Sequence, residues 1–154
     1  QKNKIIYNEK IKKKKKKDKK KKIELPVFED VQMGISTGLA LEGYIPVTCY
    51  PRFDFLIVAM NQLVNHLDKI RKMSVNEFKP RVIIRTSIGS KKPLNGGVQH
   101  TQDYSKVFKN ILTEIEVVNL KNPNKIFPEY KKALTRKDKK STLLIENGDF
   151  YNSK

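Results

Sequence analysis

The chain has 154 residues, 38% of them hydrophobic, which suits a single domain large enough to bury a core. Its formal net charge is +17 and its isoelectric point is about 9.9, but this charge is concentrated at one end. Residues 1–22 hold thirteen lysines against one glutamate and one aspartate, a net charge of +11, so residues 23–154 carry only +6. The high isoelectric point therefore describes a tail and excludes little about the fold.

No apolar run approaches the ~20 residues that a membrane-spanning helix needs, and no signal peptide is evident, so we expect no membrane partner. Cys49 is the single cysteine, which excludes an intrachain disulfide and suits a reducing compartment. The sequence therefore predicts a cytoplasmic protein.

The lysine-rich segment, residues 1–22, is expected to be disordered or a frayed helix, because the lysine runs 12–17 and 19–22 repel one another and offer little to bury. A solvated tail is favoured over a polyanion-binding arm, whose attraction would fall steeply as salt rises. No aromatic residue interrupts these runs, so bases have no stacking platform and nucleic acid is not the expected partner.

From Ile23 onward, strand and helix patterns alternate. A short extended piece over 23–28 precedes a helix over 29–41, which Gly43 ends. Gly34 and Gly38 share one face of this helix, which suggests that another backbone or a ligand comes close. The later elements are a strand over 45–50, a helix over about 55–73 with Asp54 as its N-cap, a strand over 81–86, a loop over 87–103, a helix over 104–112, a strand over 115–120, a helix from Asn122-Pro123 to about Thr135, and a strand over 141–146.

This alternation predicts βαβ units, and hence a three-layer α/β/α fold around a mainly parallel sheet, with residues 23–150 as the domain. Ligands in such folds bind beyond the carboxyl ends of the strands. The loops 51–54 and 87–103 both leave strand carboxyl ends, so we expect a site there.

Several motifs occur in a recognisable order. The block IELPVFEDVQMGISTGLALEGYIPV, residues 23–47, places an acid shortly after a proline and then three glycines at fixed spacing: Pro26, Glu29, Gly34, Gly38 and Gly43. Further along stand an aromatic–x–aromatic loop, Arg52-Phe53-Asp54-Phe55, the loop Gly97-Val98-Gln99-His100-Thr101-Gln102, and the last strand, Thr142 to Glu146. Over residues 23–148 the chain resembles the transketolase-like pyrimidine-binding domain, and especially the beta subunit of 2-oxo-acid dehydrogenases.

The resemblance implies the thiamin-diphosphate-binding fold and a role for each matching residue. Glu29 matches the glutamate that hydrogen-bonds N1′ of the cofactor's aminopyrimidine, where an acid favours the imino tautomer that removes the thiazolium proton. Phe55 matches the aromatic residue that packs on the pyrimidine ring, and Phe53 and Pro51 are expected to line the same wall. His100 matches a histidine that faces the substrate or its acyl acceptor.

Each of these residues also has an ordinary structural interpretation. Glu29 would suit a helix N-terminus, where the dipole favours a carboxylate by ~0.3–1 kcal/mol. Phe55 would suit core packing, and His100 would suit a loop histidine that satisfies local backbone groups. Arg52 and Arg85 fit an anionic substrate and a surface or sheet-edge role equally well.

The resemblance also implies a partner. The family binds the cofactor's diphosphate through Mg²⁺ on a domain with a Gly-Asp-Gly stretch and a later asparagine, and no such pair occurs here. We therefore expect that this chain contributes no metal ligand and that an alpha-type chain holds the diphosphate and the metal. We also expect a second copy of this chain in the assembly, and no activity for the chain alone. The substrate is either a 2-oxo acid or a ketose. The alternatives are a non-catalytic remnant or interaction module of the same fold, and polyanion binding through the lysine-rich segment.

Overall fold

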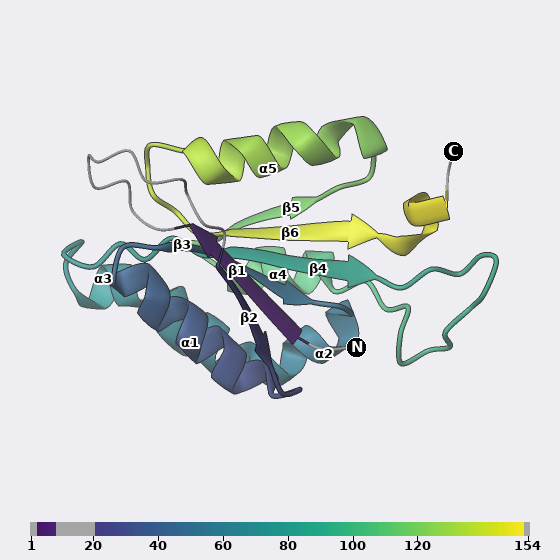
Figure 1. Cartoon of the computed structure of the whole chain (residues 1–154), viewed down its shortest axis with the longest axis horizontal. Helices are drawn as coiled ribbons and strands as arrows, with labels where there is room; N and C mark the ends of the chain where they lie inside the picture. The colour runs from purple at the N-terminus through teal and green to yellow at the C-terminus, as the bar shows by residue number, and fades with distance from the viewer. Residues whose placement is uncertain (1–2, 9–20, 153–154) are drawn as a thin grey trace.

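The computed structural model describes residues 3–8 and 21–152. These residues form a six-stranded sheet in the order β2-β1-β3-β4-β6-β5, whose strands are the labelled arrows of Figure 1. The four strands that run parallel are β3 (Ile45–Tyr50), β4 (Ile83–Ile88), β6 (Thr142–Asn147) and β5 (Glu116–Asn119). The strand β1 (Asn3–Asn8) lies antiparallel between β2 (Lys21–Leu25) and β3.

Helices cover both faces of the sheet, which completes the three layers predicted from the sequence (Figure 1). One face carries α1 (Glu29–Leu41), α4 (Ser105–Ile111) and a helical path from 53 to 73, whereas the other face carries α5 (Ile126–Thr135). The path consists of α2 (Phe53–Leu56), a 3₁₀ turn (Ile57–Ala59), a π-helical stretch (Asn61–Leu67) and α3 (Ile70–Met73). A 3₁₀ turn (Pro123–Lys125) precedes α5, and another (Gly148–Asn152) follows β6.

Successive side chains of a strand point to opposite faces of the sheet, so the core has two parts, one on each face. The larger core lies between the sheet and the helices α1, α2 and α4, and includes Tyr50, Ile84 and Leu143. The smaller core lies under α5, where Ala133 packs with Leu120 and Leu144. Each fully buried side chain of this size contributes roughly 1.5–3 kcal/mol, so the two layers together hold the parallel strands in place.

The helix α1 forms where the sequence predicts it. Glu29 and Asp30 occupy its first turn, where the helix dipole favours carboxylates. It ends because Gly43 adopts φ +86°, a left-handed conformation that side chains disfavour, and the Tyr44 N–H then donates to the Leu39 carbonyl at 3.0 Å.

Four local expectations need correction. Residues 3–8 are a strand, because Ile5 pairs with both Ile23 and Thr48 in antiparallel register, and residues 9–20 lie outside the described part of the chain. Asp54 lies within α2 and does not cap it, since the capping position is Arg52. The strand β4 begins two residues later than predicted. A side chain at Gly34 would meet only the Gln62 side chain at 3.7 Å, and one at Gly38 would meet nothing within 4 Å, so among the described residues no backbone comes close to either glycine.

Candidate functional site

The candidate site begins where β3 ends beside the first turn of α1. Tyr50, the last residue of β3, is fully buried and its hydroxyl donates to the Glu29 backbone carbonyl at 3.3 Å. Burial raises the pKa of the Tyr50 hydroxyl well above its usual range, so it stays protonated and keeps this contact. One turn further along α1, the Gln32 amide donates to the Thr48 hydroxyl at 2.7 Å and to the Cys49 carbonyl at 3.1 Å. The start of α1 is thus fastened to β3, and the Glu29 side chain lies half-buried at that junction.

The chain then turns from β3 into α2 and presents one aromatic ring to the outside. The Pro51 carbonyl accepts from the Ser87 hydroxyl at 2.8 Å, which ties the exit of β3 to that of β4. Phe55, 42% exposed, meets the His100 ring edge to face, with ring centroids 5.5 Å apart. The turn therefore brings together two residues that lie 45 positions apart in the sequence.

The loop that carries His100 is held by contacts with α2, with the end of β4 and within the loop itself. The Asp54 carboxylate accepts from the Gln102 N–H at 3.3 Å, and the His100 N–H donates to the Gly97 carbonyl at 3.0 Å. A Cβ atom on Gly89 would lie 1.8 Å from the His100 carbonyl oxygen, so only glycine fits at the end of β4. These contacts hold the imidazole in place without contacting its nitrogen atoms.

Two polar atoms of this loop region have no partner among the described residues. The His100 Nδ1 and one carboxylate oxygen of Asp54 are both buried, and neither forms a hydrogen bond. Because buried polar atoms in folded proteins are nearly always paired, such atoms point to a ligand, a water molecule or another chain that completes the site.

Comparison with known proteins identifies the family. The family model "Transketolase, pyrimidine binding domain" matches residues 7–152. The chain belongs to this family.

Curated relatives include the pyruvate dehydrogenase E1 component subunit beta of Gracilaria tenuistipitata var. liui, 26% identical over 86% of this chain and 39% of that protein. The 2-oxoisovalerate dehydrogenase subunit beta of Bacillus subtilis (strain 168) is 27% identical over 57% of this chain and 26% of that protein. The mitochondrial pyruvate dehydrogenase E1 component subunit beta of Saccharomyces cerevisiae is 29% identical over 58% of this chain and 24% of that protein. The chain thus spans well under half the length of these relatives.

Within this pyrimidine-binding domain, the predicted site residues separate into two groups. Glu29, Phe55, His100 and the backbone of Pro51 lie around the carboxyl ends of β3 and β4. Phe53 lies elsewhere, because it is 0% exposed and packs in the core against two aromatic rings. Its side chain has no surface to offer a cofactor, so the expected wall position does not hold for Phe53.

Sequence reasoning missed three residues that shape the site: Tyr50, Asp54 and Gly89. Asp54 was assigned to a helix cap, and nothing in its local sequence signals that it instead anchors a loop 48 residues away. Gly89 directly follows β4, and a glycine at a strand end before a loop is a signal that could have found it.

The Arg85 side chain binds other side chains of this domain. Its Nε and Nη2 donate to one Glu146 carboxylate oxygen at 3.1 and 2.6 Å, and the Tyr130 hydroxyl donates to the other oxygen at 2.6 Å. Burial would raise the pKa of Glu146, but the hydrogen bonds from Arg85, Tyr130 and Tyr151 outweigh it and hold the pKa below its usual value. This ion pair joins β4 to β6 under α5, which favours the structural interpretation of Arg85 over contact with a substrate.

Residues 3–8 and 21–152 contain no group of three or more histidine, cysteine, aspartate or glutamate side chains arranged to hold a metal ion. Within the same ranges, no helix combines the length and the apolar character that crossing a bilayer requires.

Proposed function

We propose that this chain holds the aminopyrimidine end of thiamin diphosphate and forms one half of the active site of a thiamin-diphosphate-dependent enzyme. One observation carries the proposal: beyond the carboxyl ends of the parallel strands, Phe55 meets the His100 ring with centroids 5.5 Å apart. Phe55 lies on the segment that follows Tyr50 and its contact with Glu29, and His100 lies on the loop that follows β4. Carboxyl ends of strands are where α/β folds bind ligands.

The residues present fit the pyrimidine end of this cofactor. The half-buried Glu29 carboxylate would accept a hydrogen bond from, or share a proton with, the ring nitrogen N1′. The exposed face of Phe55 would pack against the pyrimidine ring, and the His100 imidazole beside it would bind a substrate oxygen. When bound, thiamin diphosphate supplies an electron sink for the bond next to a carbonyl.

The rest of the active site is proposed to come from other chains. An alpha-type chain would hold the diphosphate and Mg²⁺, and a second copy of this chain would complete the assembly. The names of the relatives favour a 2-oxo acid over a ketose as substrate. The chain alone is expected to be inactive, and the single cysteine agrees with a cytoplasmic location.

The test uses the chain assembled with its alpha-type partner, and compares Glu29→Gln with Glu42→Gln, an exposed glutamate after the end of α1. Glu29→Gln should lower cofactor-dependent turnover by roughly 10²-fold or more, because glutamine cannot exchange a proton with N1′. Glu42→Gln should leave turnover unchanged, and both variants should assemble normally by size-exclusion chromatography. Full activity of assembled Glu29→Gln would show that the role given to Glu29 is wrong.

Two alternatives make different predictions. A non-catalytic module of the same fold would assemble with its partner, yet show no heat of binding for thiamin diphosphate and Mg²⁺ in calorimetry of the assembled complex. Polyanion binding through the lysine-rich segment would show an affinity that falls steeply with salt and disappears when Lys12 to Lys17 are replaced by glutamine.

A further inference from the structure

A cavity opens at the end of the sheet opposite the candidate site. Its volume is about 670 Å³, within the range of about 300–1,000 Å³ typical of small-molecule sites. It lies where β3 begins at Ile45, where the chain enters β4 at Arg81, and where the chain leaves α5 toward β6. The charged side chains that line this basic pocket are Lys79, Arg81, Arg136, Lys137, Lys139 and Glu77.

The positive charge of the basic pocket is largely uncompensated. Among the described residues, the ammonium groups of Lys79, Lys137 and Lys139 form no hydrogen bond or ion pair. The Arg81 guanidinium donates only to the Arg136 backbone carbonyl, at 3.0 Å, and binds no carboxylate. Burial, and then the nearby charge of Arg136, lower the pKa of Arg81, and the charge of Asp138 only partly offsets them. The Arg81 guanidinium is therefore stabilised when an anion binds to it.

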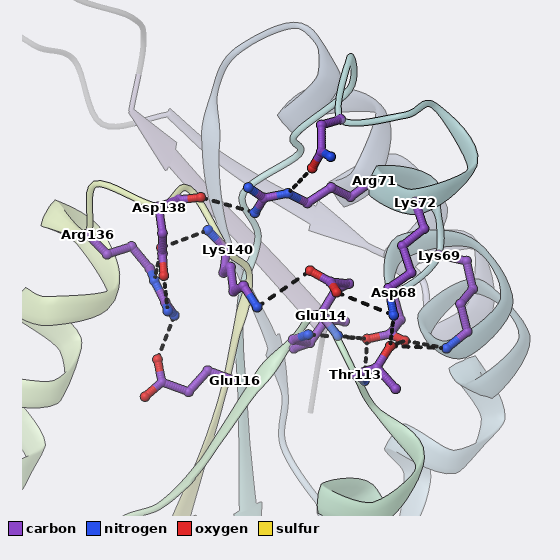
Figure 2. A network of polar contacts seen from close by, with 12 residues as sticks. Asp68, Lys69, Arg71, Lys72, Thr113, Glu114, Glu116, Arg136, Asp138 and Lys140 are labelled. Carbon is purple, nitrogen blue, oxygen red and sulfur yellow. Dashed lines mark hydrogen bonds and ion pairs between the residues drawn. The ribbon is translucent and has the colours of Figure 1, made fainter.

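Two of the lysines sit on a turn that is already rigid. Asp138 lies between Lys137 and Lys139 in the sequence, and its two carboxylate oxygens accept from Nε and Nη2 of Arg136 at 2.6 and 2.8 Å (Figure 2). Arg136 holds the pKa of Asp138 down to about 2, so this pairing persists at any ordinary pH. The Arg71 guanidinium donates to the Asp138 carbonyl at 3.1 Å, and Lys139 adopts φ +56°, a conformation costly for a residue with a side chain. The turn therefore presents its ammonium groups without needing to be ordered first.

Aromatic rings lie beside these cations. Tyr44 and Phe78 both line the cavity, and Phe78 is 51% exposed although it is a large apolar side chain. An exposed ring beside several cations suits a ligand with a planar base and a strongly anionic group, because aromatic faces stack on bases whatever their sequence.

We propose that the basic pocket binds a nucleoside triphosphate, with its phosphates on Arg81 and the lysines of the 136–140 turn and its base against Phe78. The proposal does not depend on the proposed function, since the basic pocket shares no residue with the Glu29, Phe55 and His100 group.

The experiment titrates the full chain with ATP, tripolyphosphate and adenosine by isothermal calorimetry at physiological salt. The test variant is Lys137→Gln with Lys139→Gly, in which glycine suits the positive φ at 139. The control is Lys106→Gln with Lys109→Gln, which removes the same charge from the exposed side of α4. The lysine-rich segment is present in both variants, so its contribution is constant. The test variant should bind ATP roughly tenfold more weakly or worse, and the control should bind it normally.

A third variant, Phe78→Ala, tests the base. It should weaken ATP binding roughly fivefold or more and leave tripolyphosphate binding unchanged, while adenosine should show no binding to any form of the chain. Equal losses in the test and control variants, or no saturable binding of ATP, would overturn the proposal. Equal effects of Phe78→Ala on ATP and tripolyphosphate would overturn the assignment of a nucleotide. Glu29→Gln should bind ATP normally, so failure here and failure of the proposed function are distinguishable.

Discussion

Asp68 offers the sharpest test of how the fold is held together. Its carboxylate is fully buried at the end of the π-helical stretch, next to the segment that enters β5. One oxygen accepts from three successive backbone N–H groups, those of Thr113, Glu114 and Ile115, at 2.9, 2.8 and 3.2 Å. The other accepts from the Thr113 hydroxyl at 3.0 Å and from the Lys69 ammonium at 2.6 Å (Figure 2).

The Asp68→Ala substitution would leave these donors without their acceptor. Each buried donor left unpaired costs about 1–3 kcal/mol, but water can reach the exposed Thr113 and the partly exposed Lys69. The deeply placed N–H of Ile115 cannot be compensated in this way. We therefore expect a loss of roughly 3 kcal/mol in the free energy of unfolding, a large part of the ~5–15 kcal/mol that holds a domain together.

The same contacts predict a dependence on pH. Burial would raise the pKa of Asp68, but the hydrogen bonds from Lys69, Glu114 and Thr113 outweigh it and hold the pKa below its usual value. A depressed pKa in the folded state means that the contribution is complete above the unfolded value of about 3.9 and is lost as the pH falls through the folded value. The difference between the native chain and Asp68→Ala should therefore shrink at acid pH.

Urea unfolding followed by circular dichroism, at neutral pH and near pH 3, measures both effects. Asp68→Asn keeps one carbonyl oxygen and should recover part of the loss, whereas the exposed Glu42→Ala should change stability little. A loss below about 1 kcal/mol for Asp68→Ala, or a loss that stays constant down to pH 3, would refute this account of the site.

Two other substitutions test the candidate site and its support. Gly89→Ala should displace the His100 loop, because the distance of 1.8 Å between the new Cβ atom and the His100 carbonyl oxygen must open beyond 3.0 Å. The nuclear Overhauser effect between Phe55 and His100 should therefore disappear. It should persist in the control Gly38→Ala, where a new Cβ atom meets nothing within 4 Å. Glu146→Gln should lower the free energy of unfolding by roughly 3 kcal/mol, because it leaves the partly buried Arg85 without its carboxylate; an unchanged urea midpoint would contradict this.

Local signals were sufficient for most of the domain. The strand over 45–50 and the helix over 29–41 coincide with β3 and α1, because a short apolar segment and a helix that ends at a glycine are both local signals. The strand β1 was missed because lysine runs dominate its neighbourhood. Its pairing depends on long-range register with Ile23 and Thr48, which charge and composition do not reveal.

The candidate site was only partly predictable for the same reason. The sequence pattern marks Glu29, Phe55 and His100, but the alternation of Phe53 and Phe55 does not say which ring faces the core. Packing decides it, since Phe53 fills the space between Tyr104 and Phe108. The anchoring role of Asp54 likewise depends on a loop that only the folded chain brings near.

The geometry of the candidate site rests on the register of three parallel strands. A slip of one residue would move every side chain to the opposite face of the sheet, which would carry Tyr50 away from Glu29. Two side-chain contacts oppose such a slip: Ser87 with Pro51 between β4 and β3, and Arg85 with Glu146 between β4 and β6. The partly buried ion pair under α5 therefore acts on the site from the far face of the sheet, because the strand that carries Arg85 also leads to Gly89 and, after it, to the loop of His100.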